Sequence, residues 1–328
     1  MNPVQSGAPV AMAIVLPAYN EEITIEATMR AFLAAAPQAF LVVVDNNSQD
    51  ATAAIARRVL EGPEATGCIV REERQGKGYA VRAGFAAVDA ELYVLCDADS
   101  TYPAEQLAEL ARPVAEGRAD MAVGDRHSSG AYERANKRAG HGTGNRVVAS
   151  LINRLFRARL ADILSGYRVF SREFVANFPI LSGGFEIETE ITLHALDKRF
   201  RVVEVPVAYR ERPEGSVSKL DTVRDGTRVL ATILQVLRYF RPLYLFGSLA
   251  VAFSLLGLGI GAVPVYQFVT TGLVLSVPAA VLAASLEVVA LVFGAIGFVN
   301  DALVRQHRFD FELALNRWRR EQRGVAAR

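Results

Sequence analysis

Two aspartates separated by one residue, Asp97 and Asp99, directly follow the apolar run LYVLC. Two carboxylates at this spacing at the end of a strand can both approach one hard cation, and Mg²⁺ or Mn²⁺ is characteristically held by one or two carboxylates together with substrate phosphates. The pair therefore predicts a divalent metal site beside a diphosphate. The Asp-x-Asp pattern alone is common, so its place after a strand is what favours this interpretation, with Asp97 nearer the nucleotide and Asp99 nearer the metal.

Three further polar segments lie next to predicted strands, at residues 17–22, 45–50 and 74–78. Each also has an ordinary interpretation, in which its polar side chains cap helices and its glycines form turns. Together with the aspartate pair, however, they give four polar segments at one edge of the predicted sheet. This grouping favours a nucleotide site.

The first 125 residues alternate short apolar runs with stretches of helical period. The runs are predicted as buried strands at 12–17, 40–45, 68–70, 92–97 and 121–124, with helices at 22–36, 50–61, 78–88 and 104–116. This alternation predicts an α/β fold, a mainly parallel sheet with flanking helices. Ligands bind such sheets outside the carboxyl ends of the strands, which is where the polar segments lie.

The composition limits the class of protein. The 328 residues are 51% hydrophobic and 22% charged, too apolar for a disordered chain and too charged for a wholly membrane-embedded one. Lys and Arg number 36 against 35 Asp and Glu, and the net charge of +1 argues against nucleic acid as a main partner. Cys68 and Cys96 build neither a disulfide framework nor a cysteine metal site, so a reducing cytoplasm is expected.

One long block near the C-terminus is uncharged: residues 242–286 contain no Asp, Glu, Lys, Arg or His. Since about 20 apolar residues span a bilayer, this block and the stretch after it predict two transmembrane helices, at 243–263 and 275–299. Arginines flank the pair and none lies at its tip, so the positive-inside rule puts both termini in the cytoplasm. The first ten residues show no signal-peptide pattern. Glu287 lies inside the second span.

Amphipathic segments flank the two spans. Residues 221–241 place apolar residues at helical spacing with arginines between them, which predicts an interfacial helix in the headgroup region. A second basic helix is predicted at 309–323. The expected organisation is a cytoplasmic domain at 1–220, the interfacial helix at 221–241, a transmembrane hairpin at 242–300 and a basic cytoplasmic tail at 301–328, which together make a multi-pass protein of the cytoplasmic membrane.

Six motifs resemble, in order and spacing, those of family 2 glycosyltransferases of the dolichyl-phosphate mannose synthase and polyprenyl-phosphate glycosyltransferase kind. They are LPAYNEE, VVVDNNSQDAT, RQGKGYAVRAGF, LCDADSTYP, SGYRVF and RPEGSVSKL, and the resemblance extends over about residues 12–240. The resemblance implies an A-type glycosyltransferase fold, a divalent metal (Mg²⁺ or Mn²⁺), a nucleotide diphosphate sugar of the GDP-mannose or UDP-glucose type, and a dolichyl or undecaprenyl phosphate acceptor. It does not specify the sugar.

The family pattern implies a role for each matching residue. Pro17, Tyr19, Glu21 and Asp45 are expected to hold the base and ribose, with Asn20 in the same donor site, Lys77 near the donor, and Asp97 and Asp99 on metal and diphosphate. The chain departs from the pattern at two positions. Asn46 replaces a usual second acid, which puts a charge-based contact there in doubt. Thr101 stands where Gln is frequent, so water is expected in place of that side chain at the metal.

Residues 126–168 resemble an acceptor region. The stretch 126–145 is basic, rich in glycine and poor in large apolar residues, and is predicted to be a loop over the site, with an ordinary solvated loop as the alternative. The basic residues expected to act from it are Arg126, Arg134, Lys137 and Arg138.

Further candidates come from three later segments of the chain. Arg168 closes the stretch DILSGYR, which resembles a family element, and is a candidate phosphate ligand or a surface ion-pair residue. The resemblance matches Glu188 to an acid near the sugar, although acids in a first helical turn also complement the helix dipole. Arg212, Ser218 and Lys219 fit phosphate binding, because Arg offers a fork of donors and Lys a compact charge. A basic loop at the membrane surface is the alternative for this last segment.

These features predict a membrane-anchored enzyme that transfers one hexose, with inversion, from a nucleotide diphosphate sugar to polyprenyl phosphate, making a lipid-linked sugar for cell-envelope glycosylation. A phosphate monoester has a second pKa of about 6, so the acceptor needs no general base. Two other classes stay open: a catalytically silent nucleotide-sugar-binding partner, and a lipid-translocating membrane subunit, which Glu287 would suit. A homo-oligomer is also open.

Overall fold

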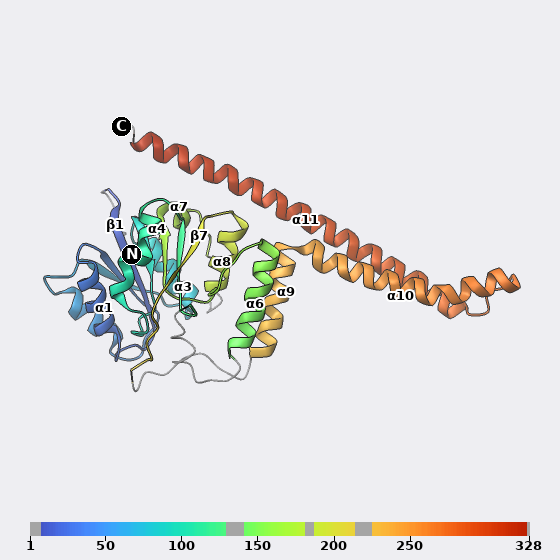
Figure 1. Cartoon of the computed structure of the whole chain (residues 1–328), viewed down its shortest axis with the longest axis horizontal. Helices are drawn as coiled ribbons and strands as arrows, with labels where there is room; N and C mark the ends of the chain where they lie inside the picture. The colour runs from blue at the N-terminus through green and yellow to red at the C-terminus, as the bar shows by residue number, and fades with distance from the viewer. Residues whose placement is uncertain (1–7, 129–140, 181–186, 214–224, 327–328) are drawn as a thin grey trace. The chain divides into compact units, whose positions relative to one another are not determined.

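The computed structural model describes residues 8–128, 141–180, 187–213 and 225–326 (Figure 1). The chain divides into two compact units, Met1–Val223 and Arg224–Arg328. The first unit contains a β-sheet with helices packed on it, and the second contains helices.

The described strands of the first unit form one seven-stranded sheet. They are β1 (Val10–Ala18), β2 (Phe40–Asp45), β3 (Gly67–Arg71), β4 (Ala90–Leu95), β5 (Met121–Asp125), β6 (Arg168–Ser171) and β7 (Val202–Pro206). Their order is β3-β2-β1-β4-β6-β5-β7, with β6 antiparallel to β4 and β5 and the other neighbours parallel. The five predicted strands correspond to β1–β5, and the predicted mainly parallel sheet with flanking helices is confirmed.

Helices follow most of the strands. Those described in the first unit are α1 (Ile25–Ala35), α2 (Thr52–Leu60), α3 (Lys77–Ala87), the 3-10 helix η1 (Ala104–Gln106), α4 (Leu107–Ala115), α6 (His141–Phe156), α7 (Arg172–Ala176) and α8 (Ile187–Asp197). The first four predicted helices correspond to α1, α2, α3 and the η1–α4 segment.

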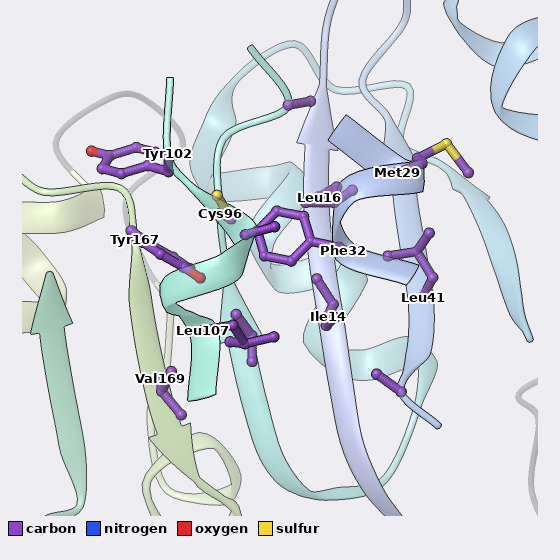
Figure 2. Packing of buried hydrophobic residues seen from close by; sticks show 14 of the residues in the cluster. Ile14, Leu16, Met29, Phe32, Leu41, Cys96, Tyr102, Leu107, Tyr167 and Val169 are labelled. Carbon is purple, nitrogen blue, oxygen red and sulfur yellow. The ribbon is translucent and has the colours of Figure 1, made fainter. Parts of the chain in front are cut away.

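The sheet is covered on both faces, which explains why its central strands are nearly continuous apolar runs. On one face, Ile14 and Leu16 of β1 pack with Phe32 of α1 and Leu107 of α4 (Figure 2). On the other face, Gly84 of α3 approaches β1 so closely that an added Cβ would overlap the side chain of Val15. This packing fixes the carboxyl ends of β1, β2 and β4, where the polar segments begin.

Three elements of the first unit, β6, α6 and α7, were not predicted. β6 is four residues long and begins with an arginine, so it carries no clear strand pattern. The expected loop over 126–145 is wrong at its end, because α6 begins at His141. Val148, Ala149 and Ile152, which follow the predicted loop, are buried and give this helix its apolar contacts.

The second unit contains α9 (Asp225–Phe240), α10 (Pro242–Thr271) and α11 (Val277–Ala326). Both α10 and α11 hold an 18-residue window apolar enough to cross a membrane, with mean hydropathy 2.0 and 2.3, and only 6% and 11% of these windows is buried. Core helices of a soluble domain would bury their apolar side chains, so the exposure favours membrane association.

Helix α11 is longer than a membrane span. Its 50 residues rise about 75 Å at 1.5 Å each, whereas about 20 residues cross the hydrocarbon core. The second basic helix predicted at 309–323 is therefore a continuation of the second span and not a separate element. An i,i+4 ion pair between Asp301 and Arg305 lies at the start of this charged part.

Helices α10 and α11 lie side by side (Figure 1) and pack through small residues. At the closest described approach, an added Cβ on Gly257 would lie 2.8 Å from Glu287 Oε1 and 3.2 Å from Ala283 O. The Ser254 hydroxyl donates a hydrogen bond of 2.9 Å to Glu287 Oε2. Glu287 of α11 is thus directed at α10.

Replacing Gly257 with Leu should separate α10 from α11, because the new side chain meets Glu287 and Ala283. Gly259 has open space around it, so Gly259→Leu is a matched control with the same gain in helix propensity. We expect Gly257→Leu to cost about 1–3 kcal/mol and to lower the midpoint of thermal loss of helical circular dichroism in detergent. Equal midpoints for the two variants would contradict this packing.

Candidate active site

Charged side chains from five segments meet at the carboxyl ends of the strands. They come from the segment after β1, the first turn of α3, the turn after β4, the first turn of α8 and the loop after β7. We call this group the strand-end cluster, and it consists of Glu21, Lys77, Asp97, Asp99, Glu188 and Arg212. All six were predicted as site residues.

Lys77 is the central cation of the strand-end cluster. Its Nζ lies 2.5 Å from Asp97 Oδ1 and also pairs with Glu188 Oε1. Burial alone would lower the pKa of Lys77, but the charges of Asp97 and Glu188 outweigh it and raise this pKa. Lys77 is therefore a firmly charged group held between two carboxylates.

Asp97 and Asp99 differ in exposure. The Asp97 side chain is 29% exposed and the Asp99 side chain only 5%. Asp99 Oδ2 lies 2.5 Å from Arg212, and Asp99 Oδ1 accepts hydrogen bonds from the hydroxyl and N–H of Thr101. Burial and the charge of Asp97 nevertheless raise the pKa of Asp99. A buried carboxylate whose pKa is raised in this way is stabilised by an additional cation. The carboxylate oxygens of Asp97 and Asp99 are hard ligands, which fit Mg²⁺ or Mn²⁺.

Gly166 sets the space available to Asp97. A Cβ built on Gly166 would overlap the Asp97 carboxylate, and the Gly166 N–H donates a hydrogen bond of 2.9 Å to the Tyr102 hydroxyl. Gly166 was not among the predicted site residues, although it lies in the motif SGYRVF, two residues before Arg168. A glycine at this position of the motif is the feature that could have indicated it.

Asn46 positions the segment that carries Lys77. Its amide nitrogen donates to Glu72 O and Arg74 O, and its oxygen accepts a hydrogen bond of 2.8 Å from the Gly76 N–H. An aspartate could not make the two donor bonds, so the departure from the family pattern here has a structural use. Gly76 has a φ of 145°, which a residue with a side chain rarely adopts.

The other departure, Thr101, holds a site residue directly. Its hydroxyl donates a 2.6 Å hydrogen bond to Asp99 Oδ1. In addition, Thr101 O accepts a hydrogen bond from the Arg210 N–H, which attaches the loop after β7 to the turn after β4. Thr101 thus fixes Asp99 and helps to bring Arg212 within reach of it.

The backbone is strained where three of the strands end. Asn20, Asn47 and Ser100 follow β1, β2 and β4 and have φ values of 51°, 65° and 59°. Asparagine tolerates this region better than most residues, whereas Ser100 is held there by its contacts with Thr28 and Thr24. Such strain is concentrated at functional sites in many proteins.

Comparison with known proteins identifies the family. The model of glycosyl transferase family 2 matches residues 13–178. Glycosyltransferase AglJ of Haloferax volcanii is 32% identical over 310 residues, which are 92% of this chain and 96% of AglJ. The chain belongs to glycosyl transferase family 2.

Other relatives and solved structures agree with this family 2 assignment. A dolichyl-phosphate hexose transferase of Haloferax volcanii is 30% identical, covering 69% of this chain and 93% of its own. A polyprenol monophosphomannose synthase of Mycolicibacterium smegmatis is 31% identical, covering 63% and 80%. Glucosyl-3-phosphoglycerate synthase of Mycobacterium tuberculosis, solved with Mn²⁺, uridine diphosphate and glucosyl-3-phosphoglycerate, matches with a TM-score of 0.52 at 23% identity, covering 69% of this chain and 79% of its own. The fold is the A-type glycosyltransferase fold.

Two arginines of this family 2 glycosyltransferase have positions that sequence reasoning did not foresee. Arg168, expected at a phosphate, is fully buried at 0% exposure. It donates to Ser165 O, Ile163 O and Thr192 Oγ1, and burial lowers its pKa to about 10. A guanidinium enclosed in this way does not face a ligand, so Arg168 supports the site from within.

Arg126 is also largely enclosed. Its Nε and Nη2 donate to the two oxygens of Asp162 at 2.6 and 2.9 Å, and its guanidinium lies 5.5 Å from the ring centroid of Tyr209. A direct contact between Arg126 and the acceptor stays a prediction, while its bond to Asp162 is a property of the fold.

The residues expected at the donor lie together at the ends of β1 and β2. Pro17 and Ala18 pair with Val44 and Asp45, and Asn20 Oδ1 accepts from the Gln49 N–H at 2.8 Å. Glu21 contacts Arg212 at 3.9 Å and is tied by its N–H to Thr52. Tyr19 adjoins this group. That these residues hold the base and ribose remains a prediction.

Five other predicted site residues lie outside the described residues, so the prediction for them is untested. They are Arg134, Lys137, Arg138, Ser218 and Lys219.

The Arg126–Asp162 pair gives a prediction on stability. Burial would raise the pKa of Asp162, but hydrogen bonds and charge from Arg126 outweigh it and lower this pKa. The stabilisation is thus present above the unfolded pKa of about 3.9 and is lost as the pH falls through the lower folded value. Asp162→Asn should cost about 3–5 kcal/mol in urea unfolding at pH 7, since it leaves a buried arginine uncompensated.

Glu26→Gln is the control for this measurement, because Glu26 forms only exposed ion pairs with Arg30 and Arg58. It should leave the urea midpoint nearly unchanged. If both variants had the same midpoint as the unmodified protein, the Arg126–Asp162 pair would not stabilise the fold.

Proposed function

We propose that this family 2 glycosyltransferase transfers one hexose, with inversion, from a nucleotide diphosphate sugar to polyprenyl phosphate at the cytoplasmic face of a membrane. The donor is of the GDP-mannose or UDP-glucose type, and the lipid-linked product would serve cell-envelope glycosylation. The strand-end cluster is the observation that carries the proposal, because it joins two carboxylates suited to a divalent metal to two cationic side chains at the carboxyl ends of the strands.

The chemistry of a nucleotide sugar matches this cluster. The reaction separates a sugar from a diphosphate, so negative charge builds up on the leaving group and must be stabilised. Asp97 and Asp99 would hold Mg²⁺ or Mn²⁺, which would supply Lewis-acid stabilisation of the diphosphate when bound. Lys77 and Arg212 would place two further positive charges beside it.

The acceptor is inferred from three observations. Two relatives are named for transfer to dolichyl phosphate and polyprenol phosphate, and the chain contains two apolar helices. In addition, Glu188 is paired with Lys77 and is not set apart as a base. A phosphate monoester is largely dianionic near neutral pH and can attack without a base, which suits such a site. The basic residues Arg126, Arg134, Lys137, Arg138 and Lys219 are proposed to position this phosphate, with the hydroxyl of Ser218 as a hydrogen-bond donor.

Asp99→Asn tests the function directly. Purified protein in detergent is supplied with polyprenyl phosphate and, in turn, GDP-mannose, UDP-glucose and related donors, and the lipid product is detected by mass spectrometry. We expect transfer with one donor, loss with a chelator, recovery with Mg²⁺ or Mn²⁺, and a fall on the order of 100-fold in Asp99→Asn.

The negative outcomes separate the alternatives. Binding of a nucleotide sugar without transfer to any polyprenyl phosphate would favour a silent binding partner. Transfer that is unaffected by the chelator would overturn the metal assignment while leaving the glycosyltransferase activity.

The membrane arrangement has its own test. A reporter fused after Arg328 should be cytoplasmic and one inserted at Thr270, near the end of α10, should be external, because arginines flank the helix pair and are missing at its tip. Accessibility of both reporters to a membrane-impermeant reagent in intact and opened cells measures this. The same side for both reporters would rule out a two-span hairpin.

A further inference from the structure

We infer that Lys77 and Arg212 compete with the metal for the carboxylates of Asp97 and Asp99, so that metal and nucleotide sugar raise each other's affinity. This inference rests on the proposed function, since it concerns the metal and diphosphate of that reaction. It assigns the two cations a second role as exchangeable partners of the metal-binding carboxylates.

The first argument is the use of each carboxylate oxygen. Asp97 gives Oδ1 to Lys77, while its Oδ2 lies against Gly166. Asp99 gives Oδ2 to Arg212, while its Oδ1 accepts from Thr101. Both carboxylates thus present one oxygen to a cationic side chain, and a metal ion bound to these two oxygens would compete with Lys77 and Arg212 for them.

The second argument is that each cation has another carboxylate to retain it. Lys77 also pairs with Glu188, and Arg212 lies 3.9 Å from Glu21. A cation displaced from Asp97 or Asp99 therefore stays at the edge of the site and does not move into solvent. From there it can contact the diphosphate that enters with the metal.

The third argument is the charge of the strand-end cluster. Its four carboxylates and two cationic side chains carry a formal charge of −2 when all are ionised. One divalent ion would balance this charge, but the ion alone would also leave Lys77 and Arg212 with fewer carboxylate contacts. A diphosphate restores those contacts. Metal and nucleotide should consequently raise each other's affinity by the same factor.

The experiment measures Mn²⁺ binding and not activity. Free Mn²⁺ is followed by electron paramagnetic resonance in the purified full chain, with and without UDP or GDP. The unmodified protein should bind Mn²⁺ weakly alone and more tightly with one nucleotide. Lys77→Gln and Arg212→Gln should each bind Mn²⁺ alone about tenfold more tightly than the unmodified protein, and should lose most of the effect of nucleotide.

Two controls make the result specific. Arg210→Gln removes a neighbouring arginine whose side chain pairs with the exposed Glu105, so it should bind Mn²⁺ like the unmodified protein. Asp99→Asn should weaken Mn²⁺ binding under all conditions. Circular dichroism of each variant confirms that it is folded, and two independent cation variants guard against failure of one of them.

The possible failures are distinguishable. If the unmodified protein binds Mn²⁺ with nucleotide but neither cation variant binds Mn²⁺ alone more tightly, the inference is wrong and the metal of the proposed function stands. If Mn²⁺ binds to none of the proteins under any condition, both the inference and the metal assignment are wrong.

Discussion

The ion pairs of Lys77 with Asp97 and Glu188 are the interaction on which the rest of the site depends. They join α3, the turn after β4 and α8, of which the first and last are 111 residues apart at the contact. A buried ammonium is stable only while its carboxylate partners remain, because desolvation would otherwise be uncompensated. These three segments are therefore fixed to one another at the carboxyl ends of the strands before any substrate arrives.

Arg168 shows how the surrounding fold maintains that arrangement. It donates to Thr192 Oγ1, and the same hydroxyl donates at 2.9 Å to the carbonyl oxygen of Glu188. Arg168 also donates to Ser165 O, beside the glycine that lies against Asp97. The enclosed guanidinium of Arg168 thus supports the segments that carry both carboxylates paired with Lys77. The motif DILSGYR, which was predicted to bind phosphate, therefore has a structural role.

The sequence predicted β1–β5 and the strand-end acids, because buried parallel strands with polar ends are local patterns. It did not predict which partner each polar side chain takes. Asn46 and Thr101 were noticed only as departures from a family pattern, yet both make hydrogen bonds that position Lys77 or Asp99. Arg168 was predicted to be a phosphate ligand or a surface ion-pair residue, whereas its buried partners, such as Thr192, 24 residues away, are decided by the fold. The order of short β6 between β4 and β5 is equally non-local.

The helix pair obeys a different constraint from the strand-end cluster. An acid in an apolar span is tolerated when it faces another helix, and Glu287 accepts a hydrogen bond from Ser254 while its other oxygen lies against Gly257. The hydrogen bond from Ser254 and the close approach of Gly257 place Glu287 at the contact between α10 and α11. Among the described residues, Glu287 Oε1 is buried without a hydrogen-bond partner, so this contact satisfies one of the two carboxylate oxygens. The strand-end cluster, by contrast, lies in the first unit and pairs its carboxylates with cationic side chains.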